Sequence, residues 1–168
     1  DSNPSVFEWL DSPIVYAEDP LFAGVRDVAP RCFSPLKCAH HYLSLARNNR
    51  RNYLSAELVR IKKYLYVTRG LLAARWVADE HMPAPMRFSE LVDAKLEPAL
   101  KPAIDEVLAI KAASNEGELH PHLPELDAWI AASFDELETV VTQVSPITAP
   151  RWEELDEVFL EVLKGIAG

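Results

Sequence analysis

Lys62, Tyr66 and Arg69 are spaced so that an α-helix would place their side chains in one row along one face. An ammonium group and a guanidinium group can hold a phosphate, and a tyrosine ring between them can stack on a base or a sugar. The spacing therefore suggests a phosphate-binding row. The same spacing is at least as typical of a tyrosine that packs in the protein core while the neighbouring Lys and Arg side chains are solvated. The sequence alone leaves both interpretations open.

The row lies in the most basic part of an acidic chain. Between Ser34 and Trp76, nine Lys and Arg residues accompany a single acid, Glu57, and nine minus one gives a charge of +8. The whole chain has a formal charge of −9, so the remainder carries −17. Clustered cations repel one another unless an anion meets them, which favours a surface that faces phosphates or another polyanion. The nine cations are Lys37, Arg47, Arg50, Arg51, Arg60, Lys62, Lys63, Arg69 and Arg75.

Composition sets the outer bounds on the class of protein. A chain of 168 residues fits one domain with a sizeable core, and 49 % hydrophobic residues exclude a mostly disordered chain. No apolar run approaches the roughly 20 residues of a membrane span, and the start does not resemble a signal peptide. We therefore expect a cytoplasmic protein without a membrane partner.

Thirteen prolines and several capping residues divide the sequence into helical segments. Asp19-Pro20 and Ser34-Pro35 each pair an N-cap residue with a proline in the first helical turn. Apolar periodicity supports the later helices. The pattern predicts an all-α fold, a bundle of about six helices. The predicted helical ranges are 20–29, 34–54, 56–79, 89–96, 101–113, 126–144 and 150–166.

The beginning of the chain suggests a piece of something larger. It starts at Asp1 without a methionine, and Pro13 to Tyr16 reads as a short extended segment. A single strand cannot make a sheet, so this segment is either an irregular connector or the remnant of a missing α/β catalytic domain. We predict that residues 1–33 form a linker with short helices, and that residues 34–168 form the helical bundle domain.

Two blocks of the chain resemble a family of bacterial enzymes. The blocks are SPLKCAHHYLSLARNNRRNYL (34–54) and VRIKKYLYVTRGLLAARWV (59–77), and the opening NPSVFEWLDSPIVY adds to the similarity. They look like the helical C-terminal part of predicted nucleotidyltransferases of the DNA polymerase beta superfamily, of the RNA-ligase-associated type. Members of that family carry, ahead of this part, a small mixed sheet. Its Gly-Ser turn and Asp-x-Asp pair bind the nucleoside triphosphate and two magnesium ions.

The chain departs from that family where the chemistry would lie, because it contains neither a Gly-Ser dipeptide nor an Asp-x-Asp pair. Two-metal phosphoryl transfer needs such carboxylates. We therefore expect no catalytic residue and no metal site here, and an inactive chain when alone. Magnesium and the nucleoside triphosphate would bind to the intact parent protein, through an N-terminal catalytic domain missing from this chain.

The resemblance also implies which residues contact a ligand. The helical part would close one side of the cleft and present cations to the triphosphate or to an acceptor, RNA or DNA. The block that contains Lys62, Lys63, Tyr66 and Arg69 is the more distinctive, so these residues are the first candidates. Arg47 and His41 are the second candidates. Two alternatives remain, a free-standing helical nucleic-acid-binding module and a protein-interaction bundle whose basic face docks an acidic partner.

Overall fold

The computed structural model describes residues 3–115, 117–145 and 152–167. In this part the chain forms eight α-helices, three short 3-10 helices and no strand. The predicted all-α class is therefore confirmed, with more helices than the six or so expected. The α-helix that has no counterpart among the predicted ranges is the short one over Pro4–Leu10.

Residues 3–32 contain two helical stretches, one a single short helix and the other a continuous run of three. Helix α1 (Pro4–Leu10) begins where the Asn3 side chain accepts a hydrogen bond from the amide of Ser5 at 3.1 Å. Asp19 caps the 3-10 helix η1 (Pro20–Phe22), which runs on into α2 (Ala23–Val28) and η2 (Ala29–Cys32). The connection over 11–19 contains neither helix nor strand, so the segment from Pro13 to Tyr16 is irregular.

Two long helices form the centre of the molecule. They are α3 (Pro35–Tyr53), capped by Ser34 as predicted, and α4 (Lys62–Glu80). Helix α4 contacts α3, α5, α6 and α7, and ten of its residues are buried. The α3 and α4 backbones approach closely at Gly70, where an added Cβ would lie 2.9 Å from the Cβ of Ala46. Glycine at this position therefore allows the two helices to pack.

The predicted start of the second long helix near residue 56 is wrong. Residues 54–61 form bends and a turn, and α4 begins only at Lys62. Val59 pairs in antiparallel fashion with His120, through amide-to-carbonyl hydrogen bonds of 2.9 and 2.8 Å. Because this bridge occupies the backbone groups of Val59, the helix cannot extend through it.

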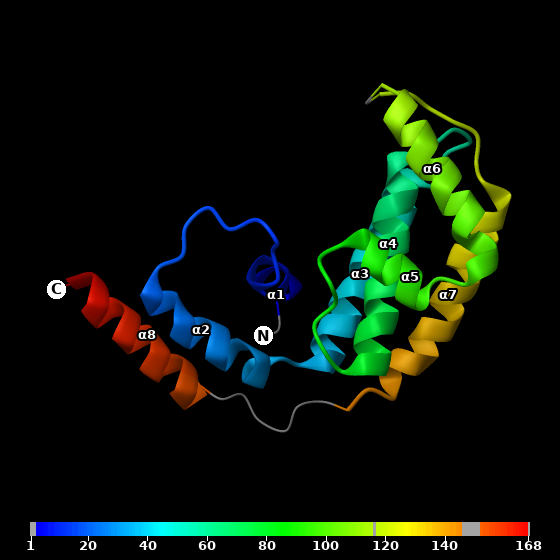
Figure 1. Ribbon diagram of the computed structural model, residues 1–168. Helices are drawn as coiled ribbons and strands as arrows, with labels where there is room; N and C mark the ends of the chain where they lie inside the picture. The colour runs from blue at the N-terminus through cyan, green and yellow to red at the C-terminus, as the bar shows by residue number, and fades with distance from the viewer. Residues whose placement is uncertain (1–2, 116, 146–151, 168) are drawn as a thin grey trace.

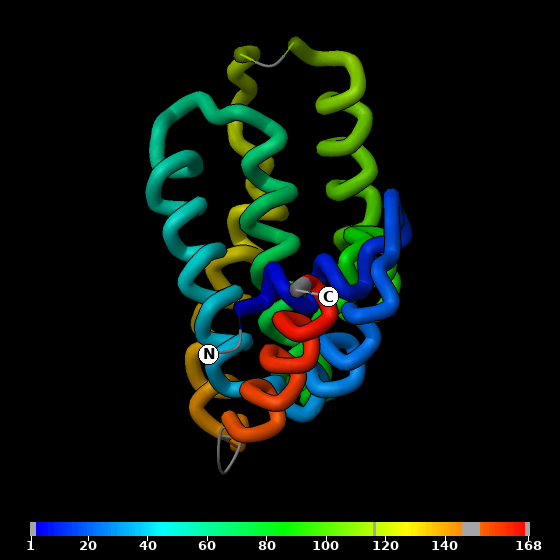
Figure 2. The backbone as a smooth tube through the Cα atoms, turned by 90° about the vertical axis from the view of Figure 1, so that its left-hand side faces the viewer, coloured from blue at the N-terminus to red at the C-terminus, as the bar shows by residue number. Residues whose placement is uncertain are grey.

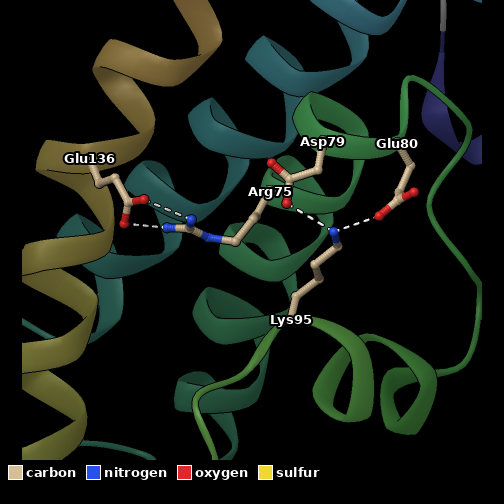
Figure 3. A network of polar contacts seen from close by, with 5 residues as sticks. All are labelled: Arg75, Asp79, Glu80, Lys95 and Glu136. Carbon is tan, nitrogen blue, oxygen red and sulfur yellow. Dashed lines mark hydrogen bonds and ion pairs between the residues drawn. The ribbon is translucent and has the colours of Figure 1, made fainter.

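Three further helices complete the bundle around α4 (Figure 1). They are α5 (Phe88–Lys95), α6 (Lys101–Ala113), which follows the 3-10 helix η3 (Pro98–Leu100), and α7 (Pro124–Thr142). Figure 3 shows how ion pairs join α5 and α7 to α4. Arg75 donates two hydrogen bonds to Glu136 of α7, and Lys95 of α5 lies 2.8 Å from Asp79 and 2.7 Å from Glu80. Arg75 is therefore engaged in packing.

Helix α8 (Trp152–Ala167) packs against α2 and η1 instead of joining the bundle. Figure 1 shows α1, α2 and α8 to one side of the long helices, and Figure 2, viewed from that side, shows them in front. The residue at which the last helix was predicted to start, Pro150, lies outside the described residues. None of the described helices combines the length and apolar composition that a bilayer crossing requires.

Candidate functional site

A cavity of about 280 Å³ lies between α1, α3 and α4, and we call it the α1–α3–α4 cavity. It brings together three of the six residues that the sequence singled out, one from α3 and two from α4. Both polar and apolar residues line it, and the polar ones come from segments far apart in the chain. The polar lining residues are Ser5, Glu8, His41, Tyr42, Asn49, Tyr66 and Arg69.

Arg69 holds the inner side of this cavity. Its Nη2 lies 2.9 Å from Oε1 of Glu8, and both side chains are about one quarter exposed. The hydroxyl of Tyr42 donates to the same carboxylate oxygen at 2.9 Å. Burial, and after it the charge of Glu8, raises the pKa of Tyr42 well above its ordinary value, so this hydroxyl remains a donor. Glu8 therefore ties α1 to both long helices.

Glu8 and Tyr42 were not among the candidate site residues predicted from the sequence. A signal for Glu8 was present, because Pro4, Phe7 and Glu8 are spaced to share one face of a short helix that Asn3 caps. An acid on the inward face of a helix needs a cationic partner. The partner, Arg69, lies 61 positions away, and nothing in the local pattern predicts the pair.

Tyr66 lines the cavity, and Lys63 lies beside Tyr66 but is not part of the lining. Tyr66 is 49 % exposed. The ammonium nitrogen of Lys63 lies 4.9 Å from the centre of the Tyr66 ring and 3.6 Å from that of Tyr53. These are cation–π distances, so the three side chains form one continuous group across the ends of α3 and α4.

The remaining two candidates point elsewhere. Arg47 donates to Glu138 of α7 at 2.6 Å, and its guanidinium lies over the ring of Phe134. Lys62 lines a second, smaller cavity of about 130 Å³ with Lys111 and others at the N-terminal end of α4. The predicted row along α4 is therefore divided, with Tyr66 and Arg69 in one cavity and Lys62 in another.

The basic stretch divides into cations that have carboxylate partners and cations that do not. Arg47, Arg69 and Arg75 pair with Glu138, Glu8 and Glu136. Within the described residues, four other cations of this stretch form no ion pair with a carboxylate. They are Arg50, Arg51, Arg60 and Lys63.

The described residues contain no group of three or more His, Cys, Asp or Glu side chains that could hold a metal ion. His120 lies 3.1 Å from the hydroxyl of Ser114, and His122 bonds to protein groups through both ring nitrogens. The magnesium ions that the resemblance implies stay an expectation for the intact parent protein. No chemical step through magnesium can be assigned to these residues.

A partly buried polar cluster around Tyr64 of α4 connects three segments of the chain. The hydroxyl of Tyr64 donates to Asp127 at 2.8 Å and accepts from the amide of Leu123 at 3.2 Å. His122 bonds to the same carboxylate through Nδ1 and to the carbonyl oxygen of Ala56 through Nε2, both at 2.7 Å. These bonds fasten the 54–61 segment to the start of α7.

We predict that His122 makes stability depend on pH. The carbonyl of Ala56, and after it Asp127, raises the pKa of His122 above its usual 6.5. The stabilisation is therefore complete below about pH 6.5 and is lost as the pH rises through the higher folded-state pKa. We expect the melting-temperature difference between wild type and His122→Asn to be largest near pH 6 and to shrink toward pH 9. A similar pH trend for the exposed His40→Asn would contradict the assignment to His122.

Comparisons with known proteins support the family resemblance of the two helical blocks. The model of a family described as RlaP, RNA repair pathway DNA polymerase beta family, matches residues 1–161. An uncharacterized protein of Bacillus subtilis (strain 168), YcgL, is 29 % identical over 167 residues, which cover 98 % of this chain and 64 % of the relative. The chain thus spans less than two thirds of that relative's length. No solved structure matches the chain. On the match over residues 1–161, the chain belongs to the RNA repair pathway DNA polymerase beta family.

Proposed function

We propose that this chain is the helical part of a nucleotidyltransferase and that its α1–α3–α4 cavity binds phosphate groups of the nucleoside triphosphate or of a nucleic-acid acceptor. The observation that carries the proposal is the convergence of His41, Tyr66 and Arg69 in one cavity, with Lys63 beside the Tyr66 ring. These donors come from two helices and lie in the most basic part of the chain. Donors that converge in a concave site are typical of anion recognition.

Glu8 positions the Arg69 side chain in the absence of a ligand. Its carboxylate oxygen accepts one N–H bond from Arg69 at 2.9 Å, as a phosphate oxygen would. Arg69 is about one quarter exposed, so the guanidinium is reached from the cavity without unfolding α4. In the proposed complex Arg69 binds a phosphate oxygen, either together with the Glu8 carboxylate or in its place.

The catalytic carboxylates, the magnesium ions and the triphosphate chemistry belong, in this proposal, to a further domain of the parent protein. The match to a relative of which this chain covers 64 % supports the proposal, as does the absence of an Asp-x-Asp pair from the sequence. The helical part then positions the substrate, and positioning contributes strongly to phosphoryl transfer.

The test measures transfer of a labelled nucleotide to a pool of short RNAs by the full-length protein with magnesium. We expect Arg69→Ala and Lys63→Ala to lower kcat/KM, Arg69→Ala by roughly 10- to 100-fold. A charge-assisted hydrogen bond contributes about 1.5–3 kcal/mol, and each 1.4 kcal/mol is tenfold. Arg47→Ala is the matched control, because it removes the same charge from a side chain that faces α7.

A second control separates phosphate binding from the structural bond between Arg69 and Glu8. Glu8→Gln keeps the shape of the side chain and removes its charge, so phosphate should meet less competition at Arg69. We expect transfer by Glu8→Gln to stay at or above that of wild type, with melting temperatures recorded for all variants. Equal losses in Glu8→Gln and Arg69→Ala, or in Arg47→Ala and Arg69→Ala, would show that the cavity does not bind the substrate.

A further inference from the structure

We infer that Tyr53, Lys63 and Tyr66 form a stacking platform for unpaired bases of a single-stranded RNA, and we call this group the Tyr53–Lys63–Tyr66 ladder. The inference rests on the proposed function and deepens it, since it names single-stranded RNA as the acceptor. Tyr53 is the last residue of α3, and the other two lie in the first turns of α4. The ladder therefore lies at the end of the α3–α4 pair where the 54–61 segment connects the two helices.

The two ladder tyrosines differ from the tyrosines that stabilise the core. Tyr42 and Tyr64 are 4 % and 0 % exposed, and their hydroxyls are hydrogen-bonded. Tyr53 and Tyr66 are 42 % and 49 % exposed, and in the described part of the chain neither hydroxyl forms a hydrogen bond. Exposed rings beside a cation suit base stacking, which contributes about 1–3 kcal/mol per base.

The charges around the ladder suit a phosphate backbone. Arg51 is in the last turn of α3 with Tyr53, and Arg60 precedes α4, whereas the guanidinium of Arg50 lies over the Phe134 ring of α7. Arg51 and Arg60 are exposed and, like Lys63, lack a carboxylate partner within the described residues. The combination of free cations with interleaved rings is typical of proteins that bind single strands.

The ladder is continuous with the α1–α3–α4 cavity. Tyr66 belongs to both, and Arg69 lies one helical turn further along α4. A strand whose bases stack on Tyr53 and Tyr66 would therefore deliver its terminal phosphate or sugar toward His41 and Arg69. A duplex offers no free base faces along its length, so the arrangement favours an unpaired end.

The binding test uses fluorescence anisotropy of a labelled oligouridine of about ten nucleotides with the full-length protein, without nucleotide or magnesium. We expect Tyr53→Ala and Tyr66→Ala each to weaken binding by roughly 5- to 100-fold, and Tyr53→Phe to stay within about twofold of wild type. Tyr16→Ala is the matched control, because Tyr16 is 96 % exposed but lies in the connection between α1 and η1. Binding by Lys63→Gln should show a salt slope shallower by about one.

Several results would contradict the proposal of base stacking but would leave the proposed function unaffected. Unchanged binding by Tyr53→Ala, or equal binding of duplex and single-stranded RNA, would exclude base stacking. Equal binding of polyglutamate, insensitive to Tyr53→Ala, would assign the basic face to an acidic protein partner. Nucleotide transfer by the wild-type protein in either case would leave the proposed function standing. Loss of transfer in Arg69→Ala with intact RNA binding separates the cavity from the ladder.

Discussion

Replacing Tyr64 with alanine should destabilise the fold by about 3–5 kcal/mol, as large-to-small changes of buried aromatic residues do. Tyr64 is 0 % exposed and makes three polar contacts, with His122, Leu123 and Asp127. Its loss leaves a cavity beside α4 and removes the partners of groups that fasten the 54–61 segment to α7. Urea denaturation followed by circular dichroism measures the change in the free energy of unfolding.

Tyr64→Phe separates the two contributions. It keeps the ring and removes only the hydroxyl, so we expect a loss of about 1–3 kcal/mol, because the amide of Leu123 and the carboxylate of Asp127 lose a buried partner. Tyr66→Ala is the comparison, since Tyr66 stands on the same helix and is 49 % exposed. Equal effects of Tyr64→Ala and Tyr66→Ala would contradict the placement of Tyr64 in the core.

Gly70→Val should destabilise the protein by about 3 kcal/mol or more, because it fills space that the α3–α4 contact leaves for a hydrogen atom. The added Cβ would lie 2.9 Å from the Cβ of Ala46 and 3.2 Å from the carbonyl oxygen of Tyr42, and one of these neighbours is main chain. Neither can move away without shifting α3. Urea denaturation and thermal melting both report the loss.

Gly70→Ala should have a smaller effect, about 1–2 kcal/mol, because the better helix propensity of alanine offsets part of the overlap. Gly117→Ala is the control, since a Cβ there meets nothing within 4 Å. We expect that variant to stay within about 0.5 kcal/mol of wild type. Stabilisation by Gly70→Ala would mean that α3 and α4 lie further apart than described.

Local signals in the sequence predicted most helices of the bundle. Ser34-Pro35 marked the start of α3, and Lys101-Pro102 that of α6, because capping and proline preferences act within one helical turn. Residues 56–61 were predicted as the first part of the second long helix. Their true conformation depends on the pairing of Val59 with His120, 61 positions away, which no local pattern encodes.

The candidate site was predicted in part for a related reason. Helical spacing placed Tyr66 and Arg69 on one face of α4, and both line the α1–α3–α4 cavity. The same spacing included Lys62, which lines a different cavity because α4 begins at that residue. Arg47 turns to Glu138, 91 positions later in the chain. Whether any of these residues contacts a ligand stays a prediction.

The short helix α1 depends on its covalent connection to the rest of the chain. Glu8 reaches Arg69 from a helix of seven residues, a length too short to be stable alone in water. The 11–19 connection has no helix or strand, and it keeps Glu8 at a high effective concentration beside Arg69. A single proteolytic cut in this connection would leave α3 and α4 covalently intact. After such a cut no covalent link within this part of the chain would hold Glu8 beside Arg69, and only the non-covalent contacts of α1 would keep the two side chains together.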